Sequence, residues 1–115
     1  MRFMALWYPA QAAAKPPPEH FAAMEGLIRD MRAAKALVDT GGWDPHSPAL
    51  RLRSQDGAVS VTDGPFAEAK EVVGGFVIMD VAKQAEAVAW ATRFMKIAGD
   101  GRCEMRELPP PHFGS

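Results

Sequence analysis

Residues 50–63 read LRLRSQDGAVSVTD, and this stretch decides the fold that we predict for the chain. Asp56 and Gly57 form the dipeptide that is favoured in the two-residue type I′ turn of a β-hairpin. Because the turn fixes the register, Gln55 should pair with Ala58, and the side chains should alternate between the two faces. One face then carries apolar side chains and one carboxylate: Leu50, Leu52, Val59, Val61 and Asp63. The opposite face carries Arg51, Arg53, Ser60 and Thr62.

Regular patterns on both sides of this hairpin predict further strands and helices. Residues 3–8 are an apolar run that Pro9 stops, which is typical of a buried strand. The spacing of apolar residues from Phe21 to Val38 predicts a helix that begins near Pro18 and ends at Gly41-Gly42. After the hairpin we predict a buried strand over 75–79, a helix over 81–97 capped by Asp80, and a half-buried strand over 102–108.

The order strand, helix, hairpin, strand, helix, strand predicts an α+β fold, a ferredoxin-like plait with two helices on one face of an antiparallel sheet. We expect the other face of the sheet to mix apolar side chains with Arg51, Arg53, Glu104 and Arg106. Such a face is too apolar for full exposure and too charged for a dry core, so we predict a homodimer whose sheets enclose a partly polar cavity. The second helix has two apolar stripes, of which one, through Trp90 and Phe94, is predicted to make a secondary contact between subunits.

The length, charge and cysteine content of the chain exclude several classes of protein. The chain has 115 residues, which suits one domain over residues 1–115. Its 13 Lys and Arg and 14 Asp and Glu give a net charge of −1, so we expect neither nucleic acid nor a membrane as a partner. Cys103 is the single cysteine, which excludes an internal disulfide and favours a cytoplasmic location.

Residues 63–71 read DGPFAEAKE, and Gly74-Gly75-Phe76 follows. This stretch closely resembles the signature of the YCII-related proteins, in the branch named for its DGPF motif. The strand that ends in Arg53, the Asp-Gly turn and Glu104-Met105-Arg106 also fall where that family has them, so the resemblance covers nearly the whole chain. It implies a dimeric α+β barrel with a site in the cleft between the sheet and the partner subunit.

The resemblance implies no single activity, since most members of the family have none established. A relative acts as a dehydrochlorinase on a chlorinated hydroxyquinone, and the wider superfamily includes muconolactone isomerases and small monooxygenases. Other YCII branches have a His and Asp pair proposed as catalytic. His20, His46 and His112 all fall in loops or at a helix start, so the sequence does not reproduce that pair.

Three arginines are the first candidates for a ligand site, because guanidinium groups hold carboxylates and enolates through paired hydrogen bonds. We expect Arg51, Arg53 and Arg106 to lie on the sheet face opposite the helices. Glu104 shares that face, so an ion-pair network with Arg53 or Arg106 is an equal alternative to an anion site.

Asp63 is the candidate proton carrier, at the end of its strand beside Leu50, although an Asp before Gly-Pro is also suited to holding a turn. Glu68 is the candidate second proton carrier and Lys70 a further substrate contact, although alternating charges there are typical of a solvated face. His46 lies between a turn-rich loop and the basic hairpin, where it can overhang the cleft as a proton carrier. Cys103 alternates with Met105 and is expected to be inert core filling.

The sequence has no HExxH or H-x-x-x-H pattern, no phosphate-binding glycine loop and no dinucleotide fingerprint, so we expect no metal and no cofactor. The leading hypothesis is a dimer that performs acid/base chemistry of a lyase, dehydrochlorinase or isomerase type on a small anionic or phenolic compound. Arg53 and Arg106 would hold the anion and Asp63 would move the proton. The alternative is a non-catalytic ligand-binding or regulatory module linked to sigma-factor transcription, and a third is a purely structural dimer.

Overall fold

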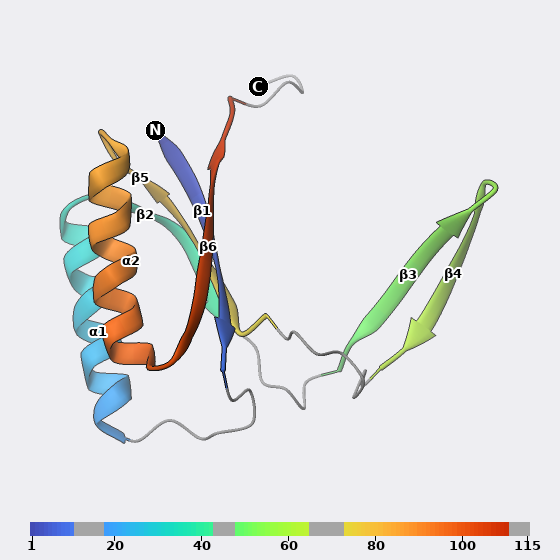
Figure 1. Ribbon diagram of the computed structural model, residues 1–115, viewed down its shortest axis with the longest axis horizontal. Coiled ribbons are helices and arrows are strands. Elements are labelled where there is room, and N and C mark those ends of the chain that lie inside the picture. Colours follow the sequence, from blue (N-terminus) through green and yellow to red (C-terminus); the bar gives the residue numbers. More distant parts are fainter. Residues whose placement is uncertain (11–17, 43–47, 65–72, 111–115) are drawn as a thin grey trace.

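A computed structural model describes residues 1–10, 18–42, 48–64 and 73–110 of the chain. Four strands form an antiparallel sheet in the order β2-β5-β1-β6, and the two helices lie side by side on one of its faces (Figure 1). The predicted α+β class with a ferredoxin-like arrangement is confirmed. In chain order the elements are β1 (Arg2–Pro9), α1 (Pro18–Ala33), β2 (Leu37–Gly42), β3 (Leu50–Gln55), β4 (Ala58–Asp63), β5 (Gly75–Asp80), α2 (Gln84–Ala98) and β6 (Gly101–Leu108).

The core lies between this sheet and the helices. Alternate residues of β1 point inward, so that Phe3, Ala5 and Trp7 are buried while their neighbours are half-buried or exposed. Met79 of β5 is fully buried and belongs to the same cluster as Leu27 and Met31 of α1 and Ala87 of α2. The apolar run at residues 3–8 is therefore a strand, as predicted.

The first helix ends earlier than predicted, and a strand follows it. Lys35 has a φ of 57°, and the amides of Lys35 and Ala36 donate to the carbonyls of Arg32 (3.0 Å) and Met31 (2.8 Å). This pair of bonds is the Schellman motif that ends many helices. Residues 37–42 then form β2 on β5, a strand that the sequence analysis assigned to the helix. Phe21, which was expected on the apolar face of the helix, is 61% exposed.

The second helix begins later than predicted and packs through its other stripe. Its N-cap is Lys83, whereas Asp80 is the last residue of β5 and accepts two hydrogen bonds from Arg2. Ala87 and Ala91 are buried, and Trp90, Phe94 and Ile97 pack against the core. Trp90 and Phe94, the stripe that was predicted to make a secondary contact between subunits, thus contact the core of their own chain, and their contact with a second subunit stays a prediction.

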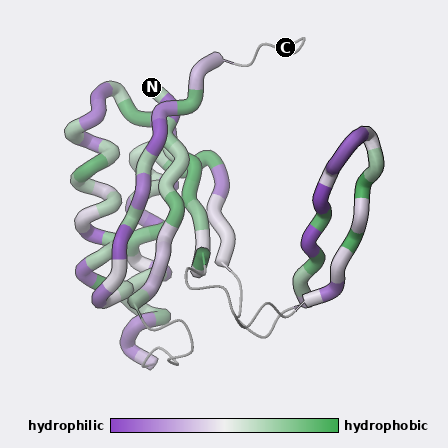
Figure 2. The backbone as a smooth tube through the Cα atoms, turned by 45° about the vertical axis from the view of Figure 1, so that its right-hand side comes forward, coloured by the Kyte–Doolittle hydropathy of each residue, from purple (hydrophilic) through white to green (hydrophobic). Residues whose placement is uncertain are grey.

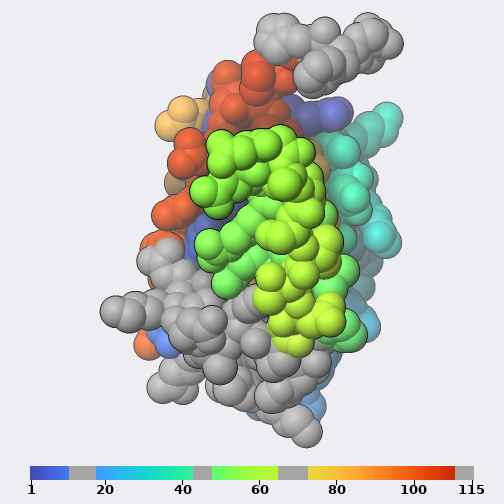
Figure 3. Space-filling model, turned by 90° about the vertical axis from the view of Figure 1, so that its right-hand side faces the viewer, coloured from blue at the N-terminus to red at the C-terminus, as the bar shows by residue number. Residues whose placement is uncertain are grey.

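The hairpin has the predicted register but does not join the main sheet. Gln55 pairs with Ala58 and Leu52 with Val61, and Asp56 and Gly57 have φ values of 52° and 81°, as a type I′ turn requires. Strands β3 and β4 form a two-stranded sheet of their own, which stands apart from the main sheet on the side away from the helices (Figure 1). Seen from that side, the hairpin lies in front of the main sheet (Figure 3). The expectation that the hairpin supplies strands to the plait is wrong: β2 takes that place.

The molecule is more extended than a compact domain of its length. Its radius of gyration is 16.3 Å, whereas a compact chain of this length has about 13 Å. Within the described ranges, no helix is long and apolar enough to cross a membrane.

Candidate functional site

The face of the four-stranded sheet that points away from the helices is the first candidate surface, and we call it the open face. Strand register identifies its residues, because side chains directly opposite each other share a face. In β1 these are Met4, Leu6 and Tyr8, which alternate with the buried residues of the core. Their partners across the sheet are Ile78 and Phe76 in β5 and Arg106, Glu104 and Arg102 in β6.

The floor of the open face is apolar and only half-buried, which is unusual for a surface in contact with water. It consists of Met4, Leu6, Tyr8, Phe76 and Ile78. The ring of Phe76 lies over Gly41 of β2, where an added Cβ would come within 2.9 Å of it. Gly41 therefore leaves room for the Phe76 ring, which a larger residue at this position would displace.

Charged side chains of β6 border this floor. The Arg102 guanidinium lies 4.2 Å from the centre of the Tyr8 ring, and its Nε donates to Glu104 Oε1 at 3.3 Å. Glu104 thus pairs with Arg102 rather than with Arg53 or Arg106, the two partners considered from the sequence. Arg106, directly opposite Met4, has no hydrogen-bond or ion-pair partner for its guanidinium among the described residues. Among the residues that the structure describes, the open face therefore offers an unpaired cation beside an apolar floor.

The hairpin carries the other predicted site residues. Its register places Arg51 and Arg53 opposite Thr62 and Ser60 on one face, and Asp63 opposite Leu50 on the other. Arg53 and Asp63 are exposed, and Arg51 is half-buried. Because the main sheet and the hairpin are separate, one chain does not bring Arg53 and Arg106 onto a common sheet face as expected. The predicted residues His46, Glu68 and Lys70 lie outside the described residues.

A cavity on the helix side of the sheet was not anticipated from the sequence. It has a volume of about 410 Å³ and is lined mainly by apolar side chains, among them Trp7, Met24, Trp90 and Phe94. Trp7 and Phe94 meet edge to face, with ring centres 5.3 Å apart. His20 and Thr40 also line the cavity, but the Thr40 hydroxyl already donates to the Phe76 carbonyl at 2.8 Å. In the sequence, the one sign of this cavity was the position of His20 in the predicted first helix.

Cys103 lines the same cavity and packs against the core, as expected for core filling. Burial raises the pKa of its thiol, and the neighbouring Glu104 carboxylate raises it further. The thiol is thus held protonated, which is unfavourable for a nucleophile.

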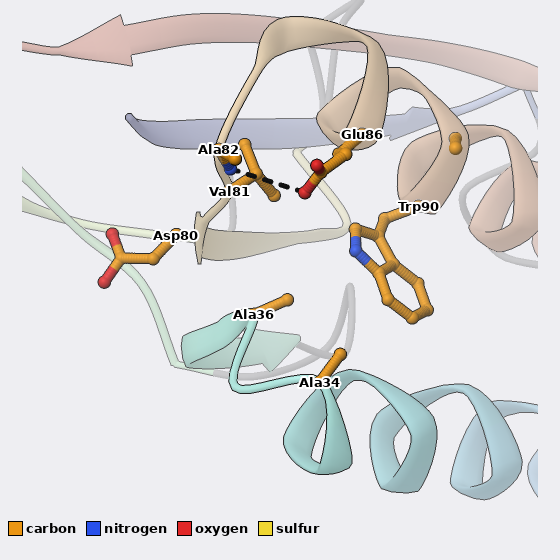
Figure 4. A pocket seen from close by; sticks show the side chains of 8 residues that line it. Ala34, Ala36, Asp80, Val81, Ala82, Glu86 and Trp90 are labelled. Carbon is orange, nitrogen blue, oxygen red and sulfur yellow. Dashed lines mark hydrogen bonds between the residues drawn. The ribbon is translucent and has the colours of Figure 1, made fainter.

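A shallow groove of about 620 Å³ lies between the end of α1 and the start of α2 (Figure 4). Its walls are mainly alanines, with Asp80, Glu86 and Trp90 as the larger side chains. Glu86 Oε2 accepts a hydrogen bond from the Ala82 amide at 3.3 Å, and Asp80 is paired with Arg2 at 2.8 Å. The hydrogen bond from Arg2 lowers the pKa of Asp80. Both carboxylates therefore serve the local structure.

Comparison with known proteins agrees with this architecture. The model of the YCII-related domain matches residues 1–108. The chain belongs to the YCII-related family. An uncharacterised protein of Rhizobium meliloti (strain 1021) is 45% identical over 74 residues, which span 58% of this chain and 60% of that relative. The described ranges of this YCII-related chain contain no cluster of three or more potential metal ligands.

Proposed function

We propose that this YCII-related protein is a homodimer that binds a compact organic anion, a carboxylate or a phenolate, on the open face and transfers a proton on it without a cofactor. The observation that carries the proposal is the Arg106 guanidinium, which has no partner within the described part of the chain, beside a half-buried apolar floor. A guanidinium holds a carboxylate or an enolate by charge-assisted hydrogen bonds, and an apolar, aromatic floor suits the carbon skeleton of the same molecule.

The proposed dimer accounts for the surface that one chain leaves uncovered. The chain exposes 8620 Å², whereas a compact monomer of 12.5 kDa exposes about 6,200 Å². Part of this excess lies on the hairpin, where Leu50, Leu52, Val59 and Val61 are 60% to 63% exposed. A second copy over the open face would also exclude water, which strengthens the attraction between Arg106 and the anion.

The proposed chemistry is a proton transfer at carbon. Asp63 takes a proton from the carbon next to a carbonyl group, and Arg106 stabilises the negative charge that develops on the enolate oxygen. Return of the proton to another carbon gives an isomerase, and departure of an anionic leaving group gives a lyase. We also infer membership in the DGPF branch, because residues 63–66 carry that motif, and a cytoplasmic location, because the chain has one cysteine.

Salicylate, which combines a carboxylate with a phenol, is the binding probe. Arg106→Gln should weaken the binding of salicylate by about 10- to 150-fold in calorimetry, the value of a charge-assisted contact. Arg93→Gln is the matched control, because Arg93 is a similarly exposed arginine that pairs with Asp30 of the other helix at 2.7 Å. Equal affinity in the wild type and Arg106→Gln would remove the proposed anion site.

Proton transfer is tested with pyruvate in D₂O, by following deuterium uptake at its methyl carbon with NMR. The wild type should accelerate the uptake, and Asp63→Asn should abolish the acceleration without weakening binding. If anions bind at Arg106 but no exchange occurs, the chain is the non-catalytic ligand-binding module of the alternative hypothesis.

A further inference from the structure

The hairpin is amphipathic, and none of the described residues covers its apolar face. Leu50, Leu52, Val59 and Val61 share one face, and their side chains are 60% to 63% exposed. Hydrophobic and hydrophilic residues alternate along both strands (Figure 2). Within the described ranges, no buried core residue belongs to the hairpin. A two-stranded hairpin alone is at best marginally stable in water, so a sheet of this kind needs a surface to pack on.

The open face is the matching surface. Its apolar floor is two strands wide, in β1 and β5, and the apolar face of the hairpin is also two strands wide. Within one chain the floor is half-buried and the apolar face of the hairpin is exposed, and the hairpin stands on the open-face side of the sheet without packing on it (Figure 1). The charged residues of β6 lie beside this floor, so a hairpin that covers β1 and β5 leaves Arg106 and the adjoining margin of the floor, at Met4, for the ligand.

We propose that the two subunits exchange hairpins, so that the apolar face of each hairpin covers the open face of the partner subunit. The occupant is a second copy of this chain because each chain carries both surfaces of the contact, one apolar hairpin face and one open face, so two copies cover all four surfaces through a symmetric pair of contacts. Within its own chain the hairpin stays apart from the sheet, which leaves both apolar surfaces available for a reciprocal contact.

The exchange has a consequence for the site, and this step rests on the proposed function. Asp63 lies on the apolar face of the hairpin, opposite Leu50, so it turns with that face toward the partner. Arg51 and Arg53 lie on the reverse face and turn away from it. Each anion site would then combine Arg106 of one subunit with Asp63 of the partner subunit, and a monomer would have no complete site.

Cross-linking between two different chains tests the exchange without any ligand. Both chains carry Cys103→Ser. One adds Leu52→Cys, and the other adds Leu6→Cys, Phe76→Cys or Ile78→Cys on the open face. The two chains are mixed, dissociated, allowed to reassociate and then oxidised. The exchange predicts a disulfide between the two different chains in at least one pairing. The matched control replaces Leu52→Cys with Ser60→Cys on the opposite face of the hairpin and should give no such link.

Each other outcome overturns the exchange. The first is that no pairing of folded chains gives a mixed disulfide. The second is that the Ser60→Cys control cross-links equally well. The third is that a disulfide forms only between two chains that both carry Leu52→Cys. A chain that carries Leu52→Cys and Ile78→Cys together shows whether the hairpin covers its own sheet, because the disulfide then forms within a monomer.

The position of Asp63 is tested through salicylate binding. If the carboxylate of the partner subunit borders the anion, Asp63→Asn should lower the dissociation constant of salicylate at least about three-fold, because a like charge is removed. Asp56→Asn, at the tip of the same hairpin, is the control and should have no effect. If Asp63→Asn and Asp56→Asn change the dissociation constant of salicylate equally, Asp63 does not border the bound anion. Cross-linking without salicylate binding would refute the proposed function alone, and binding without cross-linking would refute the exchange alone.

Discussion

Leu52→Ala should weaken the dimer far more than a substitution on the other face of the same strand. Leu52 is 61% exposed in one chain, and complete burial of a leucine side chain contributes about 1.5–3 kcal/mol. Covering the exposed part of Leu52 therefore contributes about 1–2 kcal/mol, and a symmetric dimer contains two such contacts. Truncation should cost about 2–4 kcal/mol per dimer, which raises the dissociation constant about 30- to 1,000-fold.

Sedimentation equilibrium over a range of concentrations measures this constant directly. Arg53→Ala is the control, because Arg53 lies one residue away on the reverse face of the hairpin. It should change the dissociation constant less than about five-fold, as expected for an exposed charge. A loss with Arg53→Ala that equals the loss with Leu52→Ala would show that the apolar face does not form the interface, and the reasoning would fail.

Three further predictions concern the fold. Lys35→Gly should raise the free energy of unfolding by about 0.5–1 kcal/mol in urea titration, because Lys35 has a φ of 57° that glycine adopts without strain; a destabilised variant would contradict the Schellman ending. Met79→Ala should lower the free energy of unfolding by about 2–5 kcal/mol, since Met79 is fully buried in β5, and a loss below 1 kcal/mol would contradict its core position. The raised pKa of the Cys103 thiol gives a stability contribution that is complete below the unfolded pKa of about 8.5 and is lost as pH rises above it. The difference in unfolding free energy between the wild type and Cys103→Ser should therefore shrink between pH 7 and pH 10, and a constant difference would refute the burial of the thiol.

Local signals made the hairpin predictable, whereas its place in the fold depended on distant contacts. The Asp-Gly turn and the alternation of Leu and Arg determine the register within 14 neighbouring residues. Nothing in that stretch tells whether the hairpin joins the main sheet. The strand β2 was missed because Ala34 and Val38 continue the helical spacing, and because Lys35 occupies a left-handed position where glycine is the usual signal.

The candidate site was also predictable where local signals were sufficient and not where distant contacts decided the structure. Alternation along β6 was enough to place Arg106 opposite the helices, since the period of a strand is two. The partner of Glu104 was not predictable, because three arginines had compatible positions and the choice of Arg102 depends on its stacking with Tyr8 across the strands. The orientation of α2 was also not predictable, since its two stripes are similarly apolar and only packing against Trp7 selects Phe94.

A crystal structure of the protein with bound salicylate would show both the anion site at Arg106 and the position of the hairpin. We expect a dimer in which the salicylate carboxylate lies within about 3.2 Å of the Arg106 guanidinium, at the edge of the partner subunit's hairpin. Salicylate in the cavity beside Trp7 and His20, or a hairpin folded onto its own sheet, would contradict this expectation.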